Sequence, residues 1–269
     1  GGTMSLASGG VAAFAVAWLG LATAAFAGTA EGRAALQAGD FDTALRELGT
    51  AARAGDPQAQ NLYATMLKDG AGTAPDKAAA VAWVRRAAEA GDAEAQVNLG
   101  YMMFHGDGTP RDRRGGLGWY ERAAAQGNPA AQFNAARVYW DGDGVPRDAA
   151  KALPLFRAAA QAGLAEAQFS LGVALLSPPK PDAAQAFNWF SRAACQGEAP
   201  AYAKLAALYL LGQGVAKDPV AAQTWALLGE AAGDPLAKQL REKLETDLTP
   251  EQSNAARQQA SAFVPVRER

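Results

Sequence analysis

The chain has 269 residues, in which 25 Lys and Arg nearly balance 27 Asp and Glu, giving a net charge of −2 and a pI near 5.6. This balance excludes the strongly basic surface that a phosphate backbone requires, so no nucleic-acid partner is expected. Cys195 is the only cysteine and His105 the only histidine, which excludes an intrachain disulfide and most zinc sites. No metal or cofactor is expected.

The first 27 residues have the pattern of a secretory signal peptide. Residues 11–27 are almost continuously apolar and end in Ala25-Phe26-Ala27, the small-x-small pattern that signal peptidase cleaves. Cleavage there predicts a periplasmic or secreted protein that begins near Gly28. No Lys or Arg precedes the apolar run, and about 17 apolar residues approach the lower limit for spanning a bilayer. An uncleaved inner-membrane anchor is therefore the alternative, and residues 1–3, ahead of the first Met, indicate a start-site artefact.

The rest of the chain follows a register of 36 residues. An Ala-Gln dipeptide recurs at this interval, and it is followed by a glycine pair, an aspartate, an aromatic residue or leucine, and a closing glycine. A period of this length is typical of a solenoid. The markers are Ala59, Ala95, Ala131 and Ala167 of the dipeptide; Gly70/Gly72, Gly106/Gly108, Gly142/Gly144 and Gly212/Gly214; Asp76, Asp112, Asp148, Asp182 and Asp218; and Gly91, Gly127, Gly163, Gly197 and Gly233.

Each repeat predicts two helices joined by a tight turn. In the second copy, every fourth residue over 95–103 is apolar, as on one face of a helix. Asp92 can cap the start of this helix, and Gly106-Asp107-Gly108 ends it, because glycine tolerates the positive φ of a tight turn. Asp112 then caps a second helix, which Gly127 closes. Neither helix can bury its apolar face alone, so neighbouring pairs must stack.

Both ends of the array diverge from the repeat. Residues 31–55 have the pattern of a divergent first pair. Residues 249–252 form a capping box with proline at the first helical position, which predicts a polar terminal helix that ends the stack. The expected organisation is a signal peptide over 1–27, a solenoid of about six helix pairs over 28–247, and a capping helix and tail over 248–269.

These motifs resemble the Sel-one-like repeat (SLR) family, an α/α relative of the tetratricopeptide repeat. The pattern is Ala-x-x-x-Leu-Gly-x-x-Tyr, Gly-x-Gly-Val, Asp, Ala-x-x-Trp and Ala-Ala-x-x-Gly, and it is clearest over 131–163 and 201–233. The resemblance implies an all-α, right-handed superhelical solenoid that mediates protein–protein interaction. Thr73 and Thr109 in place of valine, and Leu155 in place of tryptophan, depart from the pattern.

Isolated motifs for chemistry are weak. Ser177 and Lys180 match the Ser-x-x-Lys signature of serine β-lactamases, but two prolines separate them and the motif needs a helix. Residues 141–144 resemble the start of a calcium loop and lack its later ligands. His105 is expected to be a surface imidazole, and Cys195 a buried, inert thiol. No catalytic or metal-binding residue is predicted.

The aromatic residues fall into two sets. On the second helices, Trp119 and its equivalents are expected to be buried framework, and truncating Trp119 is expected to cost about 3–5 kcal/mol. On the first helices, a stripe at i, i+4 and i+7 varies between copies. By analogy with tetratricopeptide repeats this stripe lines the concave groove; the alternative is that it packs against the adjacent first helix. The predicted groove residues are Val97, Tyr101, Phe104, Phe133, Arg137, Trp140, Phe169 and Val173.

The sequence therefore predicts an exported, non-enzymatic module that binds a protein or peptide in its groove, as an adaptor or regulator in the bacterial cell envelope. The chain is expected to be a monomer that contacts the membrane only if its N-terminal segment is uncleaved. One alternative is a protein that binds a small ligand or cell-wall fragment, with weak β-lactamase-like activity. Another is a structural component of a larger envelope assembly.

Overall fold

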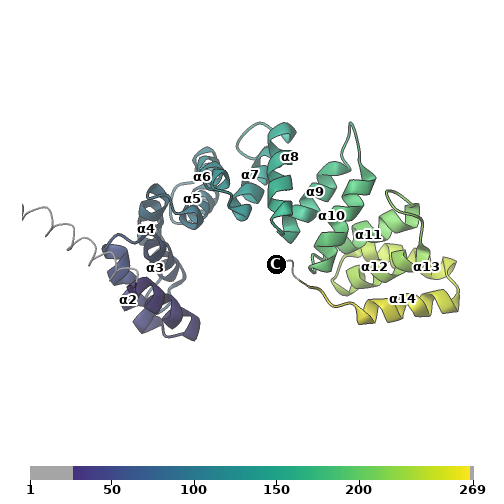
Figure 1. The fold of residues 1–269 in the computed structure, drawn as a ribbon, viewed down its shortest axis with the longest axis horizontal. Coiled ribbons are helices and arrows are strands. Elements are labelled where there is room, and N and C mark those ends of the chain that lie inside the picture. The colour runs from purple at the N-terminus through teal and green to yellow at the C-terminus, as the bar shows by residue number, and fades with distance from the viewer. Residues whose placement is uncertain (1–26, 267–269) are drawn as a thin grey trace, which may run out of the picture. The chain divides into compact units, whose positions relative to one another are not determined.

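The structure, a computed structural model, describes residues 27–266, and every regular element in this range is a helix. Consecutive helices form antiparallel pairs (Figure 1), so the predicted all-helical repeat fold is confirmed. The predicted secretory segment lies outside the described residues, apart from its last residue, Ala27. No helix within 27–266 combines the length and apolar character that crossing a bilayer requires.

The chain divides into two compact units, each of which is described by itself. The first comprises the described residues up to Ala131, together with 143–145. After a helix over residues 27–38, its helices are α2 (Phe41–Arg53), α3 (Pro57–Asp69), α4 (Lys77–Glu89), α5 (Ala93–His105) and α6 (Arg113–Ala125).

The second unit comprises residues 132–142 and the described residues from Pro146 onward. It contains α7 (Pro129–Asp141) from Gln132 on. Its further helices are α8 (Ala149–Gln161), α9 (Ala165–Leu175), α10 (Ala183–Cys195), α11 (Pro200–Leu211), α12 (Pro219–Ala231), α13 (Pro235–Asp247) and α14 (Pro250–Ala262).

Aspartate side chains begin most of these helices. Asp92 Oδ1 accepts a hydrogen bond from the Ala95 amide at 2.7 Å, and Asp112 Oδ1 accepts one from the Gly115 amide at 2.8 Å, which confirms the capping predicted for both. Each cap satisfies an amide that the first helical turn leaves without a partner. The same contact recurs at Asp56, Asp76, Asp148, Asp182, Asp218 and Asp234.

The two glycines of each pair have different roles. The first, as in Gly106 (φ +78°), ends its helix in the left-handed conformation. The second approaches the start of the preceding second helix: a Cβ on Gly108 would lie only 2.6 Å from the Lys77 carbonyl oxygen. The equivalent contacts are Gly72 with Phe41, Gly144 with Arg113, and Gly214 with Ala183. The glycine pair therefore both ends a helix and sets the spacing of successive repeats.

The recurring Ala-Gln dipeptide joins one repeat to the next by a buried hydrogen bond. The amide nitrogen of Gln96, in α5, donates to the carbonyl of Ala88, in α4, at 3.1 Å. Gln60 donates likewise to Ala52, and Gln168 to Ala160. A buried side chain that reaches a backbone carbonyl of the preceding helix fixes the register of the stack. Spacing alone marked this dipeptide as a repeat signal without revealing its role.

Gln60 lacks a hydrogen bond that the equivalent Gln96 accepts. Gln126, at the C-cap of α6, donates to Gln96 Oε1 at 2.8 Å. One repeat earlier, Gln60 Oε1 is buried without a hydrogen-bond partner, and the position equivalent to Gln126 is Ala90. We therefore expect Ala90→Gln to raise the free energy of unfolding of the first unit by about 1 kcal/mol, because it supplies the missing donor.

Denaturant unfolding followed by circular dichroism measures this gain. Ala232→Gln is the matched control, because Ala232 is the C-cap residue of α12. In that repeat the register position of Gln60 is occupied by Tyr202, so a glutamine at 232 has no glutamine side chain to donate to. An equal stability change in the two variants would show that helix propensity, and not the Gln60 hydrogen bond, is responsible.

The buried aromatic position of the second helices is one residue later than predicted. Trp119 is half-buried at the edge of the core, with the Arg122 guanidinium 4.5 Å from its ring centroid, so the expectation that it is buried framework is wrong. The next residue, Tyr120, is 3% exposed, and its equivalents Phe156 and Phe190 are 2% and 0% exposed. The arginine three residues after the tryptophan covers its ring, and the residue directly after the tryptophan places its side chain in the core.

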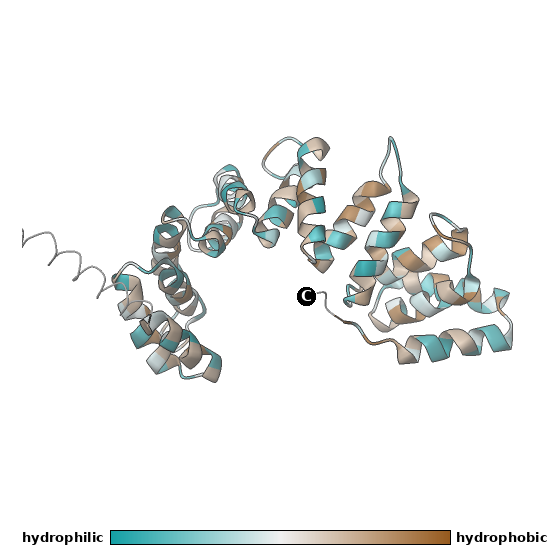
Figure 2. Cartoon of the chain, viewed as in Figure 1, coloured by the Kyte–Doolittle hydropathy of each residue, from teal (hydrophilic) through white to brown (hydrophobic). Residues whose placement is uncertain are grey.

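The C-terminal helix α14 packs against α12. The predicted capping box is present, with Thr249 and Gln252 bonded reciprocally. Thr224 Oγ1 donates to Gln259 Oε1 at 2.9 Å and links the two helices. Much of α14 is coloured hydrophilic in Figure 2, in keeping with the polar outer face expected of a terminal helix.

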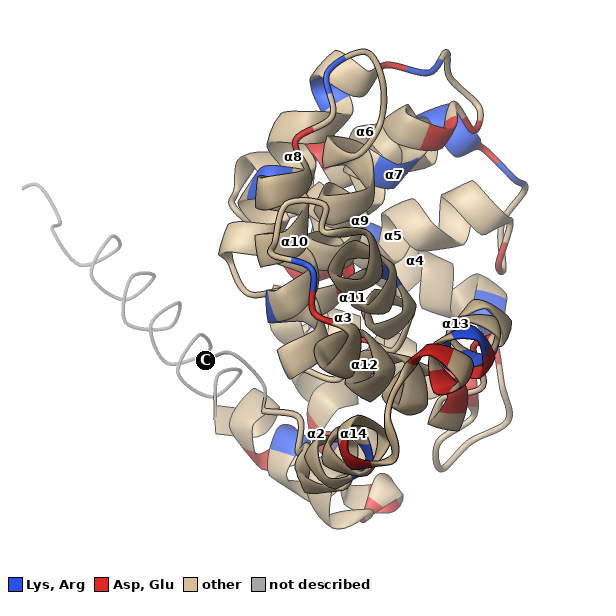
Figure 3. Cartoon of the chain, turned by 90° about the vertical axis from the view of Figure 1, so that its right-hand side faces the viewer, with Lys and Arg blue, Asp and Glu red and all other residues tan. Residues whose placement is uncertain are grey.

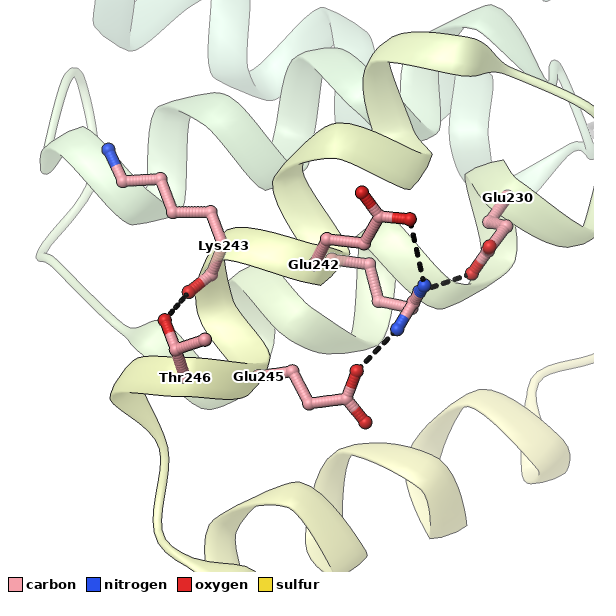
Figure 4. Close-up of polar contacts among 6 residues, drawn as sticks. Glu230, Glu242, Lys243, Glu245 and Thr246 are labelled. Atoms are coloured by element: carbon pink, nitrogen blue, oxygen red, sulfur yellow. Dashed lines mark hydrogen bonds and ion pairs between the residues drawn. The ribbon is translucent and has the colours of Figure 1, made fainter.

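Charged residues gather on α13 (Figure 3) and attach it to α12. Arg241 pairs with Glu242 and Glu245 of its own helix and with Glu230 of α12 (Figure 4). The Arg241 side chain is only 19% exposed, so this network is better shielded from solvent than an isolated surface pair. The cluster of charges on α13 is thus explained by its ion pairs within α13 and with α12, without a ligand.

Candidate binding site

Five of the eight predicted groove residues line one cavity of the second unit, with a volume of about 280 Å³. Phe133, Arg137 and Trp140 share one face of α7 at i, i+4 and i+7, and Phe169 and Val173 come from α9. The remaining lining residues are Asp141, Phe156, Glu166, Ser170 and Glu198.

Aromatic rings form much of the wall of this aromatic cavity. The ring centroid of Phe156, in α8, lies 6.1 Å from that of Phe133 and 6.2 Å from that of Trp140. The Arg137 guanidinium lies 5.8 Å from the Phe133 ring, and that of Arg147 lies 4.8 Å from the Trp140 ring. Phe133 and Trp140 remain partly exposed, so their rings offer apolar and cation-binding surface to a ligand.

A second cavity of about 420 Å³, the acidic cavity, shares Glu166 and Glu198 with the first. It lies at two turns between repeats, over residues 163–165 and 196–198. Burial raises the pKa of the Glu198 carboxyl, and the negative charge of Glu166 raises it further. The Glu166 carboxylate is therefore close enough to disfavour the charged form of Glu198.

Sequence reasoning missed Glu166 and Glu198, although the register contains a signal for Glu198. It stands where other repeats have the helix caps Asp92 and Asn128, and α11 has no side-chain cap. Glutamate is one methylene longer than aspartate and is a poor N-cap. The Glu198 carboxylate therefore does not cap α11. The start of α9 is likewise uncapped, since Leu164 holds the cap position there.

The other three predicted groove residues belong to α5, in the first unit. Tyr101 is 50% exposed and lines a small cavity of about 30 Å³, and its ring centroid lies 4.3 Å from that of His105, with the two rings tilted by 44°. Val97 is half-buried. Phe104 is only 8% exposed, because Tyr120 and the Arg113 guanidinium cover its ring, and this differs from the exposed position expected of it.

The isolated motifs do not assemble into a catalytic group. Ser177 Oγ donates to the Val173 carbonyl at 3.2 Å, and Lys180 lies in the loop that follows, not one helical turn away. His105 is exposed, as predicted. Cys195 is also exposed, so the prediction that its thiol is buried is wrong: Cys195 is the last residue of α10, and Ala194 takes the core-facing position before it.

The Sel1 repeat matches the chain five times in succession, over residues 57–92, 93–128, 129–164, 165–198 and 199–234. Among solved structures, the chain is similar to a protective antigen of uropathogenic Escherichia coli strains that displays an SLR fold. The two are 30% identical with a TM-score of 0.76, over 82% of this chain and 48% of that one.

The chain is also similar to a Sel1 repeat protein from Oxalobacter formigenes, at 32% identity and a TM-score of 0.67, over 76% of this chain and 59% of that one. It thus spans less than two thirds of the length of either relative. No curated protein matches this sequence. Because the five matches span most of the described helices, the resemblance seen in the motifs is confirmed, and the chain belongs to the Sel1 repeat family.

Proposed function

We propose that this chain is an exported, non-enzymatic interaction module, an adaptor or regulator in the bacterial cell envelope, that binds a protein or peptide at the aromatic cavity. Sel1 repeat proteins are typically protein-interaction modules. The observation that carries the proposal is the meeting of Phe133, Arg137 and Trp140 with Phe169 and Val173 at one cavity. Aromatic residues and arginine are enriched in protein interfaces and at their energetic centres.

The lining of the aromatic cavity supports binding over catalysis. Ser170 is its only hydroxyl-bearing residue, and no histidine, lysine or cysteine lines the cavity. A serine nucleophile needs an adjacent base that takes its proton. The two shared carboxylates could accept a proton, but they serve equally to attract a cationic group, and the aromatic walls need no chemistry to bind an apolar side chain.

Capture from the native envelope tests the proposed site. Tagged wild-type protein should retain a partner that mass spectrometry identifies, and Trp140→Ala should lose it, since truncating a central aromatic residue commonly costs about 2 kcal/mol or more of binding. Leu211→Ala is the control, because Leu211 is 62% exposed in the same unit but outside the cavity. Equal capture by both variants would place the interface elsewhere.

Export makes a separate prediction. In a Gram-negative host we expect the protein to reach the periplasm without its first 27 residues, as the Ala25-Phe26-Ala27 pattern indicates. The intact mass of the protein in the periplasmic fraction measures this. A full-length mass in the membrane fraction would instead favour an uncleaved anchor.

A further inference from the structure

The aromatic and acidic cavities adjoin, and carboxylates outnumber cationic side chains in the lining of each. Three carboxylates, those of Asp141, Glu166 and Glu198, line the aromatic cavity, against the single guanidinium of Arg137. The lining of the acidic cavity includes Glu166 and Glu198 and neither lysine nor arginine. A ligand that spans both cavities therefore meets apolar rings on one side and an uncompensated negative charge on the other.

The acidic pair also favours a cation on energetic grounds. Burial and the negative charge of Glu166 raise the pKa of Glu198, so the charged form of Glu198 is disfavoured. A bound ammonium or guanidinium relieves this repulsion and forms charge-assisted hydrogen bonds with the two carboxylates. A carboxylate in the same place would add to the repulsion.

An extended segment of this chain already lies beside the acidic cavity. After α14, Phe263 packs its ring against those of Tyr202 and Trp225, with centroids 5.9 and 5.4 Å away. The Val266 amide then donates to the Cys195 carbonyl at 2.7 Å, and Pro265 lies next to Gly197, which lines the cavity. The tail shows that this unit binds extended chain through an aromatic anchor and a backbone hydrogen bond.

We propose that the site recognises an extended peptide in which an apolar or aromatic side chain lies close to a lysine or arginine. The apolar side chain occupies the aromatic cavity, against Phe133, Trp140 and Phe169, and the cationic side chain pairs with Glu166 and Glu198. The inference rests on the proposed function, since it gives the chemistry of the peptide that the same cavity binds.

A display library of short random peptides tests this selectivity. The wild-type chain should enrich sequences that combine Phe, Trp or Leu with a nearby Lys or Arg. Glu166→Gln plus Glu198→Gln removes both charges and keeps the side-chain shapes, so it should keep the apolar preference and lose the basic one. The control, Glu31→Gln plus Glu89→Gln, makes the same charge change at two exposed glutamates of the other unit and should select as the wild type does.

Fluorescence anisotropy with one selected peptide gives the size of the effect. The Glu166/Glu198 double variant should bind it about tenfold more weakly or worse, as expected for lost charge-assisted hydrogen bonds. Binding to the wild type should also weaken with added salt.

The outcomes separate the two proposals. Selected peptides without a basic preference, or a preference that survives the double variant, would overturn the charge assignment. In that case a loss of enrichment with Trp140→Ala would still support peptide binding at the aromatic cavity. If the wild type enriches no peptide, the proposal of a basic and apolar peptide fails, whereas capture of a partner protein by the wild type and not by Trp140→Ala would still support the proposed function.

Discussion

Phe190→Ala should lower the free energy of unfolding of the second unit by about 3–5 kcal/mol, whereas Trp189→Ala should cost only about 1–2 kcal/mol. The Phe190 side chain is 0% exposed, and its ring fills the space opposite Gly172 of α9, where a Cβ would lie 2.6 Å from the ring. Its removal leaves a cavity that two closely packed helices cannot refill. Trp189 lies at the edge of the core, with the Arg192 guanidinium 4.8 Å from its ring.

The two variants differ by one position on one helix, so helix propensity and distance from the ends of the array are nearly constant. Denaturant unfolding followed by circular dichroism measures both, and a fluorescent label on the second unit assigns the transition to it. If Trp189→Ala were the more destabilising of the two, the tryptophan marker of the repeat would be the core residue after all.

This comparison shows what the sequence could and could not predict about the core. Spacing was enough to locate the five repeats that match the family, because most of the glycines, caps and Ala-Gln dipeptides recur at fixed positions. It could not decide which of two adjacent aromatic residues enters the core, since Trp189 and Phe190 are both apolar and lie on neighbouring parts of the same helix surface. That choice depends on where the partner helix approaches, which is set here by the glycine at position 172.

The approach of the partner helix also explains why some predicted groove residues are buried and others exposed. Phe104 and Trp140 share a register position, yet Phe104 is buried and Trp140 remains partly exposed. Helix α6 approaches α5 closely at Gly116, and Arg113 extends over the Phe104 ring. One repeat later, the position equivalent to Arg113 is Ala149, whose methyl group is too short to reach the ring; Arg147 lies 4.8 Å from the Trp140 ring instead, and that ring stays partly exposed. A stripe defined by spacing within one helix cannot contain this information.

The candidate site could be predicted only in part for a related reason. Helical spacing was enough to place Phe133, Arg137 and Trp140 on one face, and the register was enough to bring Phe169 onto the adjacent first helix. Glu198 lies outside any helix, and its role follows from what it replaces. Reading the glutamate at this cap position as a carboxylate that does not cap its helix would have identified it.

Gly214→Ala should destabilise the second unit by about 2–5 kcal/mol, and Gly233→Ala by only about 1–2 kcal/mol. Both glycines have positive φ, +72° and +86°, so alanine at either position bears the strain of the left-handed conformation. They differ in their surroundings. A Cβ on Gly214 would collide with the Ala183 carbonyl group at the start of α10, whereas a Cβ on Gly233 would meet nothing within 4 Å.

The difference between these variants measures the packing of one repeat on the next, because the backbone strain is common to both. The collision involves backbone atoms, which cannot move aside as a flexible side chain can, so relief requires the loop to lift from α10. Denaturant unfolding of the two alanine variants gives this difference directly. Equal losses would mean that the second glycine of the pair is needed only for its φ and that the repeats are not held at contact distance by this loop.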